Sequence, residues 1–381
     1  MKKRTIVCVI GTRPDALKMI PVIEALESDG RFFVETVITG QHRELLEPIL
    51  QEFHINSAIN FSVMRPDQSL NSLSAKLLSH FDRFFSENHC DLVIAQGDTH
   101  STFMAGLSAF YRKIPFAHIE AGLRTTTIHR PFPEELNRRT ISMLANLHFC
   151  PTQQSANNLS KEGIHTNVFI TGNTIIDTLY HYRKKIGVQK PTDEKIILVT
   201  CHRRENFGKP LFCITSALRK LAEQNPTIKF FFLIHPNRNV QTVVEKQLSP
   251  IPNIILSQSL NYEQLIRLIL SAYLVLTDSG GLQEEAPALN KPVLILRNET
   301  ERTESVACGA ALLVGHDVNT IIYHVERLLT DKNSYQRMCQ TGSPYGDGHA
   351  AGRIVDIITK LLTQGRVNQA RYEIDHSNSL L

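Results

Sequence analysis

Several familiar sequence signatures are missing from this chain of 381 residues, and each absence excludes a class of protein. The seven cysteines are odd in number and include no Cys-x-x-Cys pair, which argues for a reducing compartment and against a zinc site. No apolar run approaches the roughly 20 residues of a spanning helix, and the apolar run after the basic segment Met1-Lys2-Lys3-Arg4 is too short for a signal peptide. We therefore expect a cytoplasmic protein without a transmembrane segment.

A strong charge of either sign is missing as well. The chain has 41 Lys and Arg against 37 Asp and Glu, a net charge of +4, so neither nucleic acid nor a membrane surface is an expected partner. It also has no Gly-x-Gly-x-x-Gly after its first apolar run, no His-Glu-x-x-His and no Gly-x-Ser-x-Gly. These absences argue against a bound dinucleotide, zinc-dependent hydrolysis and serine-based hydrolysis, respectively.

What the sequence does contain is a repeated alternation of short apolar runs with longer amphipathic segments. The short runs are apolar throughout, as expected of parallel strands that helices cover on both faces, so the predicted fold class is α/β. Strands are predicted at 5–10, 33–39, 91–96, 115–119, 147–150, 167–171, 195–200, 229–234, 253–257, 273–277, 293–297 and 311–314. Helices are predicted at 14–29, 42–53, 70–88, 100–112, 133–145, 153–162, 173–185, 208–224, 238–247, 261–271, 281–289, 317–330, 332–340 and 350–364.

About twelve parallel strands are too many for one comfortable sheet, so two doubly wound, Rossmann-like domains are expected. The polar stretch 183–194 contains Gly and Pro and separates two series of strands, which puts the domains at 1–182 and 183–351. Residues 365–381 are predicted to form a polar tail. Ligands of such sheets bind beyond the carboxyl ends of the strands, so the two domains should face each other across a polar cleft.

A Ser-Gly-Gly turn, formed by Ser279, Gly280 and Gly281, joins a predicted buried strand to a predicted helix. Unpaired N–H groups at such a helix start, with no side chains in the way, form a ready site for a phosphate or diphosphate. An ordinary glycine turn explains the same pattern equally well. Glu284 and Glu285 follow, and they either complement the helix dipole or accept hydrogen bonds from hydroxyls such as those of a ribose.

Charged side chains follow the predicted strands of the first half. Arg13 and Lys18 lie at the start of a helix, where two cations favour an anionic ligand, although a structural Arg and a solvated Lys are the plain alternative. Asp98 follows the third strand, and either it or Thr99 could simply cap the next helix. Glu120 ends a strand between apolar neighbours and is therefore partly desolvated, as a general acid or base needs to be.

Three further polar positions extend this pattern along the chain. Glu134 opens a helix, where complementing the helix dipole is the alternative to a ligand role. His202 stands in a His-Arg-Arg-Glu-Asn segment after the first strand of the second series, and His235 follows the next strand. A cleft that binds a nucleoside diphosphate and holds several carboxylates near the attached group fits nucleotide-sugar chemistry.

Taken together, these loops resemble those of the non-hydrolysing UDP-N-acetylglucosamine 2-epimerases. The similarity runs in order from about residue 5 to about residue 362. The matching blocks are GTRPDALKM (11–19), TGQHREL (39–45), QGDTHST (96–102), HIEAGLRT (118–125), PFPEELNRR (131–139), FITGNTIID (169–177), CHRRENFG (201–208), TDSGGLQEEAP (277–287), RNETERTE (297–304) and PYGDG (344–348).

The resemblance implies a GT-B fold in which a C-terminal helix at about 352–364 packs back on the N-terminal domain. It also implies a homodimer that interconverts UDP-GlcNAc and UDP-ManNAc, without NAD, a metal or any other cofactor, as a source of ManNAc-type precursors for surface polysaccharide or glycan synthesis. The implied mechanism is elimination of UDP to give 2-acetamidoglucal, followed by re-addition of UDP.

By position, the resemblance assigns catalytic roles to Asp98, Glu120, Glu134 and His202. Asp98 and Glu134 would handle protons at the sugar with support from Glu120, and the division of work among the three stays open. His202 and Arg13 would stabilise the departing diphosphate. The implied substrate contacts are Arg13, Lys18, Ser279, Gly280, Gly281, Glu285 and Arg302.

The sequence departs from the family pattern at three places, which bears on local loop geometry. Asp15 stands where Glu is usual, Cys201 where a small residue often precedes the histidine, and Thr126-Thr127 where Gly-Asp is usual. Gln41 and His235 match residues near which some relatives bind a second UDP-GlcNAc as an activator, and allostery is left open. The alternatives are a glycosyltransferase of the same fold and a catalytically silent nucleotide-sugar sensor.

Overall fold

The computed structural model describes residues 3–40, 43–55, 57–63, 65, 68–188, 194–235, 237–258 and 260–364. The chain divides into two compact units, and the boundary falls inside one helix. The first unit contains the residues up to Thr178 together with the segment that begins at Gly346, and the second unit is Leu179–Tyr345.

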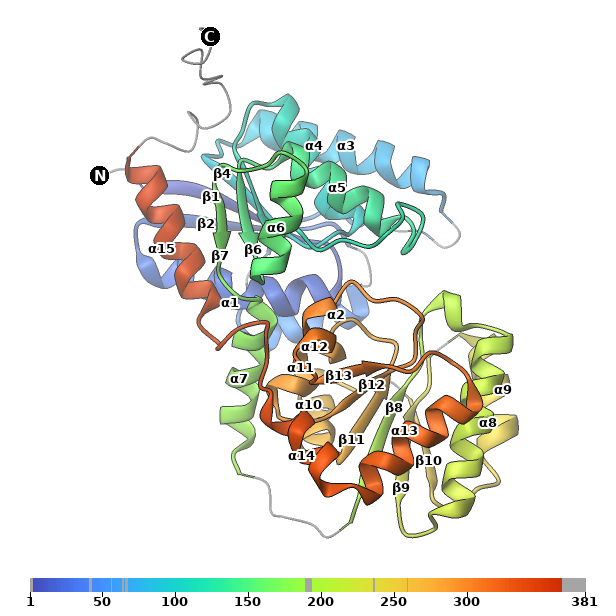
Figure 1. Cartoon of the computed structure of the whole chain (residues 1–381). Helices are drawn as coiled ribbons and strands as arrows, with labels where there is room; N and C mark the ends of the chain where they lie inside the picture. Colours follow the sequence, from blue (N-terminus) through green and yellow to red (C-terminus); the bar gives the residue numbers. More distant parts are fainter. Residues whose placement is uncertain are drawn as a thin grey trace, which may run out of the picture. The chain divides into compact units, whose positions relative to one another are not determined.

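The first unit is a parallel sheet with helices between successive strands (Figure 1). Its strands are β1 (Arg4–Ile10), β2 (Phe32–Ile38), β3 (Ser57–Asn60), β4 (Leu92–Gln96), β5 (Phe116–Ile119), β6 (Leu147–Cys150) and β7 (Val168–Ile170). Its helices are α1 (Arg13–Asp29), α2 (Arg43–Glu52), α3 (Leu70–Glu87), α4 (His100–Tyr111), α5 (Glu134–Leu144), α6 (Gln153–Lys161), the start of α7 (Thr174–Ile186) and α15 (Ala350–Thr363).

The strands of this sheet lie in the order β3-β2-β1-β4-β5-β6-β7. The direction of sequential addition reverses at β1 and β4, which creates the switch point where ligands of doubly wound sheets bind. Strand β1 is buried from Ile6 to Ile10, because helices cover both of its faces. One core cluster joins β1 and β4 to the aromatic side chains Phe81, Phe84 and Phe85 of α3.

Helix α1 begins where its sequence provides a cap. The Thr12 hydroxyl accepts a hydrogen bond from the Asp15 backbone N–H, and the Asp15 carboxylate accepts one from the Thr12 N–H, which completes a capping box. The helix ends at Gly30, whose φ of 74° is left-handed. Helix α15, from the far end of the chain, packs against α1 (Figure 1), and the backbone N–H groups of Ala350 and Ala351 bond to Asp177 of α7.

The second unit contains another parallel sheet. Its strands are β8 (Ile196–Thr200), β9 (Lys229–Leu233), β10 (Ile254–Ser257), β11 (Leu274–Thr277), β12 (Val293–Ile295) and β13 (Ala311–Leu313). Its helices are the end of α7, the short 3-10 helix η1 (Arg204–Asn206), α8 (Lys209–Gln224), α9 (Arg238–Leu248), α10 (Tyr262–Ser271), α11 (Leu282–Ala288), α12 (Thr303–Ala307), α13 (Val318–Thr330) and α14 (Lys332–Gln340).

The strands of this second sheet lie in the order β10-β9-β8-β11-β12-β13, so its switch point lies between β8 and β11. Its core joins β8, β9 and β11 to the apolar faces of α8, α9 and α13. Every strand pair of both sheets is parallel. The predicted α/β fold class with two Rossmann-like sheets is therefore confirmed.

Three short elements, β3, η1 and α12, were not predicted. Strand β3 pairs with β2 at the edge of its sheet, with a register shift between Thr36 and Val37. Helix α12 covers only Thr303–Ala307, which is too short to show helical periodicity in the sequence. Within the ranges that the structure describes, no helix has the length and apolar character that crossing a bilayer requires.

Candidate active site

The polar loops gather in each unit because the strands before them are neighbours in the sheet. In the first unit β1, β4 and β5 lie side by side, so the loops that begin at Gly11, Gly97 and Glu120 share one sheet edge. In the second unit the same is true of β8, β11 and β12, which are followed by segments 201–206, 278–281 and 296–302. Each group is described by itself.

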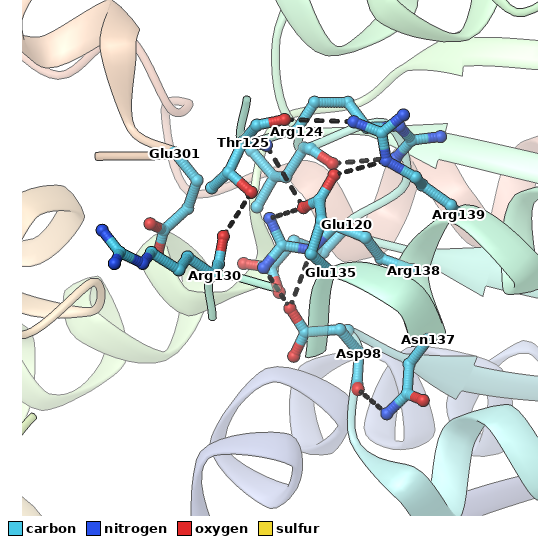
Figure 2. A network of polar contacts seen from close by, with 12 residues as sticks. Asp98, Glu120, Arg124, Thr125, Arg130, Glu135, Asn137, Arg138, Arg139 and Glu301 are labelled. Atoms are coloured by element: carbon cyan, nitrogen blue, oxygen red, sulfur yellow. Dashed lines mark hydrogen bonds and ion pairs between the residues drawn. The ribbon is translucent and has the colours of Figure 1, made fainter. Parts of the chain in front are cut away.

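Asp98 lies in the turn between β4 and α4, and helix α5 holds it in place. Its Oδ2 accepts hydrogen bonds from Nη2 of Arg138 at 2.6 Å and from Nε of Arg138 at 3.1 Å. Its backbone carbonyl accepts a bond of 2.9 Å from Nδ2 of Asn137 (Figure 2). The cap of α4 is Thr99, whose hydroxyl accepts from the Thr102 N–H, so the carboxylate of Asp98 is not used as that cap.

Glu134 is the first residue of α5 and is half-buried. Residues three and four positions apart lie on the same side of a helix, so Glu134 shares its face of α5 with Asn137 and Arg138. Because those two residues bond to Asp98, this face of α5 is the one directed at the Asp98 turn. The helix therefore brings two of the predicted catalytic carboxylates to one region.

Glu120 is the centre of a buried polar cluster directly after β5. Its side chain is 5% exposed and forms an ion pair with the ammonium of Lys18. Its carboxylate also accepts hydrogen bonds from Nε2 of Gln96 and Nδ2 of Asn173. The backbone of Glu120 has a φ of 66°, a conformation that costs a non-glycine residue on the order of 1 kcal/mol and that concentrates at functional sites.

Lys18 is accordingly neither solvated nor directed at open solvent, since it is buried and bonded to Glu120. Arg13 is the first residue of α1 and is half-buried. Asp15 is buried in the same helix start, where desolvation raises its pKa to about 7 despite hydrogen bonds from Thr12 and Thr99. The Thr99 hydroxyl donates to Asp15 at 3.1 Å, so the Asp15 carboxylate contacts the residue that directly follows Asp98.

His118 contacts the turn between β4 and α4 that carries Asp98. It is fully buried in β5, and its Nε2 lies 2.7 Å from the carbonyl oxygen of Gly97. Desolvation lowers its pKa to about 4, so the ring is neutral at physiological pH and donates its Nε2 proton to that carbonyl. Gly97, with a φ of 74°, takes the left-handed conformation that turns the chain toward Asp98.

In the second unit, Asp278 organises the segment that carries His202. The Asp278 carboxylate is fully buried and accepts hydrogen bonds from the backbone N–H groups of His202 and Arg203 and from Nδ2 of Asn206. The Nδ1 atom of His202 lies 3.1 Å from Oδ1 of Asp278. Burial alone would raise the pKa of Asp278, but these bonds and the nearby His202 lower it to about 2.

The Ser-Gly-Gly turn leads into α11 next to a network of buried charges. Nε of Arg302 donates to Glu284 at 2.8 Å, and Nη1 of Arg302 donates to Glu301 at 2.6 Å. A Cβ atom at Gly280 would lie 3.1 Å from Oε1 of Glu301 and 3.2 Å from Cζ of Arg302. Glycine at this position therefore lets the turn lie directly against the guanidinium.

Glu285 and His235 occupy two further places in the second unit. Oε1 of Glu285 accepts a hydrogen bond of 2.5 Å from the hydroxyl of Tyr262, which fixes the carboxylate at the start of α11. His235 stacks on His202 with ring centroids 6.4 Å apart, and burial together with His202 lowers its pKa. Gln41, the other residue of the possible activator site, lies outside the described residues.

The structure adds three residues to the site that were not predicted, namely Glu135, Arg138 and Asp278. Arg138 orients Asp98, Asp278 orients His202, and Glu135 is fully buried against two arginines. The Glu-x-x-Arg-Arg spacing at 135–139 is a signal that could have indicated ion pairs on one side of α5.

Each group of residues is suited to a distinct task. The first unit presents oriented carboxylates, which can take and return protons. The second presents an oriented histidine, a glycine turn and a fixed guanidinium, which can hold a diphosphate. Among the residues that the structure describes, no group of three or more His, Cys, Asp or Glu side chains could hold a metal ion.

Comparison with known proteins finds one family that matches nearly the whole chain. The family model of UDP-N-acetylglucosamine 2-epimerase matches residues 24–359. A UDP-N-acetylglucosamine 2-epimerase of Yersinia pestis is 42% identical over 365 residues, which are 92% of this chain and 97% of that protein.

Solved structures agree with the sequence comparison. The UDP-GlcNAc 2-epimerase of Neisseria meningitidis bound to UDP-GlcNAc is similar, with a TM-score of 0.90 and 39% identity over 93% of this chain and 100% of that one. A structure of an S. aureus protein with UDP has a TM-score of 0.88 and 37% identity, covering 94% of this chain and 97% of that one.

Proposed function

The chain belongs to the UDP-N-acetylglucosamine 2-epimerase family, and we propose that it is an isomerase that inverts C2 of UDP-GlcNAc to give UDP-ManNAc by elimination and re-addition of UDP. The observation that carries the proposal is the set of oriented carboxylates in the first unit, with Asp98 held by Arg138 and Glu120 held by Lys18. These groups are what proton removal and return at a sugar carbon require.

The mechanism follows from the weak acidity of the C2 proton. A carboxylate takes this proton while the C1–O bond breaks, so that the electron pair of C2–H becomes the C1=C2 double bond of 2-acetamidoglucal and UDP leaves with the electrons of the C1–O bond. A proton then returns to C2 from the opposite face as UDP bonds again to C1. Both steps are feasible only where the diphosphate charge is stabilised.

We assign the proton chemistry to Asp98 and Glu134, with Glu120 in support. Asp98 and Glu134 belong to the turn and the helix face that meet beside Asn137 and Arg138, so their carboxylates lie in one region. Glu120 is already neutralised by Lys18, which favours a role in placing groups over one as the principal base. Lys18 in turn acts on the substrate through Glu120, whereas Arg13 is assigned to the diphosphate.

We assign the second unit to the UDP moiety. Ser279, Gly280 and Gly281 would bind the diphosphate with their backbone N–H groups, and Arg302, fixed by Glu284 and Glu301, would neutralise it. Glu285 would accept hydrogen bonds from the ribose hydroxyls. His202, oriented by Asp278, would donate a proton or a hydrogen bond to the phosphate oxygen that leaves C1.

The deciding experiment is incubation of the protein with UDP-GlcNAc alone, followed by NMR of the sugar protons. The proposal predicts UDP-ManNAc without any acceptor and deuterium at C2 in heavy water. A glycosyltransferase or a silent sensor would leave UDP-GlcNAc unchanged under these conditions. A hydrolysing enzyme would release ManNAc and UDP, and either result would contradict the proposal.

We further propose a homodimer that works in the cytoplasm and supplies ManNAc-type precursors for surface polysaccharide or glycan synthesis. The support for the dimer is a set of exposed apolar side chains on the packed helices α4 and α5, namely Phe110, Tyr111, Leu136 and Met143, with Met143 72% exposed. Light scattering should report a dimer that Met143→Lys weakens and that Tyr323→Lys, on α13, leaves intact.

A further inference from the structure

We infer that Glu135 is a positioning residue of the epimerase reaction, which holds Arg138 so that Arg138 can hold Asp98. The inference rests on the proposed function, because it assumes that Asp98 acts on the sugar. Glu135 is the second residue of α5 and has no exposed surface, so its carboxylate does not meet substrate or solvent.

The geometry forms a short chain of contacts. Oε2 of Glu135 lies 3.2 Å from Nη1 of Arg138, while Nη2 and Nε of Arg138 donate to Oδ2 of Asp98 at 2.6 Å and 3.1 Å. Figure 2 shows the guanidinium between the two carboxylates. The fork of the guanidinium is planar and rigid, so fixing one of its nitrogens fixes the plane in which the others donate.

Charge gives a second reason for this arrangement. A buried arginine that faces a single carboxylate stabilises the deprotonated form of that carboxylate and makes it a poorer base. In this cluster the Glu135 carboxylate lies 3.2 Å from Arg138 and 2.8 Å from Arg139, so its negative charge offsets part of the positive charge of each. Asp98 is thus oriented by a guanidinium that is itself paired with a second, buried carboxylate.

Glu135 also connects the helix to the loop that follows β5. Its Oε2 accepts a hydrogen bond of 3.2 Å from the backbone N–H of Thr125, and its Oε1 accepts one of 2.8 Å from Nε of Arg139. Arg139 in turn donates to the Thr125 carbonyl and approaches Glu162. One buried carboxylate thereby anchors both the arginine that reaches Asp98 and the loop that leads away from Glu120.

The chain offers a matched control for separating positioning from general stability. Arg138 and Arg139 are neighbours that both bind Glu135, but Arg138 donates to Asp98, whereas Arg139 contacts Thr125 and Glu162. A change at Arg139 should therefore affect the stability of the cluster, whereas a change at Glu135 should affect turnover as well.

The test compares kcat, KM and UDP affinity for Glu135→Gln, Glu135→Asp and Arg139→Met in the full-length protein. We expect Glu135→Gln to lower kcat about 10²-fold, as for small misplacements of catalytic groups, with KM and UDP affinity within a few-fold of wild type. Glu135→Asp keeps the charge and should recover part of the loss. Arg139→Met should keep kcat within a few-fold.

A double-mutant cycle supplies the decisive readout. If Glu135 acts through Arg138, then Glu135→Gln should lower kcat little further once Arg138→Met is present. Additive losses, a wild-type kcat in Glu135→Gln, or an equal loss in Arg139→Met would overturn the inference. If Glu135→Gln does not fold, judged by its melting temperature and UDP binding, the same comparison is made with Glu135→Asp. Absence of epimerisation in the wild-type protein would instead refute the proposed function.

Discussion

The Nδ1 atom of His202 lies 3.1 Å from the Oδ1 atom of Asp278, a carboxylate that is buried and also bonded to the backbone of His202. This contact sets which ring nitrogen is free. With Nδ1–H directed at Asp278, Nε2 is the atom that can serve a ligand. The His202 side chain is 40% exposed, so its ring is accessible to a diphosphate while its orientation is fixed from within the protein.

The first prediction concerns this pair. Asp278→Asn keeps the shape of the side chain but removes the charge that orients His202, so kcat should fall on the order of 10²-fold. Steady-state kinetics on Asp278→Asn, His202→Ala and the double variant will test this. The double variant should be no slower than His202→Ala alone, and additive losses would show that the two residues act independently.

The second prediction concerns the carboxylates of the first unit. Asp98→Asn or Glu134→Gln should lower kcat by about 10²–10⁴-fold, because each removes a group that transfers a proton. UDP affinity, measured by calorimetry, should survive in both variants. Asp82→Asn on the exposed part of α3 is the control and should behave as wild type. Activity close to wild type in either site variant would remove that residue from the mechanism.

The third prediction concerns Asp15, whose pKa burial raises to about 7. Between about pH 4 and pH 7 the unfolded chain loses the proton of Asp15 while the folded protein retains it, so this residue's contribution to stability is present at pH 4 and lost as the pH rises through 7. Asp15→Asn removes this titration and should stabilise the protein at pH 8 by up to about 4 kcal/mol more than at pH 4.

Urea unfolding of wild type and Asp15→Asn at several pH values measures this difference. Asp317→Asn, at the exposed start of α13, is the matched control and should give no gain at high pH, because hydrogen bonds lower the pKa of Asp317. A constant difference between wild type and Asp15→Asn from pH 4 to pH 8 would mean that Asp15 titrates alike in both states.

The fourth prediction distinguishes the two glycines of the Ser-Gly-Gly turn. Gly280→Ala should destabilise the protein by about 1–3 kcal/mol and weaken UDP binding, because the new Cβ would lie 3.1 Å from Glu301 and 3.2 Å from Arg302. Gly281→Ala should cost less stability, since its nearest neighbour would be Oε2 of Glu285 at 3.5 Å and its φ of −62° suits alanine. Melting curves that show equal losses would contradict this difference.

Much of the fold could be predicted because its strands are buried on both faces. Runs such as Ile6–Ile10 and Leu274–Leu276 are apolar throughout, and the helices between them keep their periodicity. The elements that escaped prediction are local exceptions. Strand β3 lies at a sheet edge, where one partner suffices, α12 is shorter than two helical turns, and the 3-10 helix η1 has only 3 residues.

The sequence by itself determined which polar residues follow which strands, because strand order along the chain and the residue types of each loop are properties of the sequence. It placed Asp98, Glu120 and His202 at strand ends, and those are where the structure has them. The partners of these residues were decided by tertiary structure alone. Arg138 binds Asp98 across 40 positions, Lys18 binds Glu120 across 102, and Asp278 binds the backbone of His202 across 76. Such contacts depend on how β1, β4, β5, β8 and β11 are ordered within their sheets, and the apolar runs that form these strands carry no information about that order.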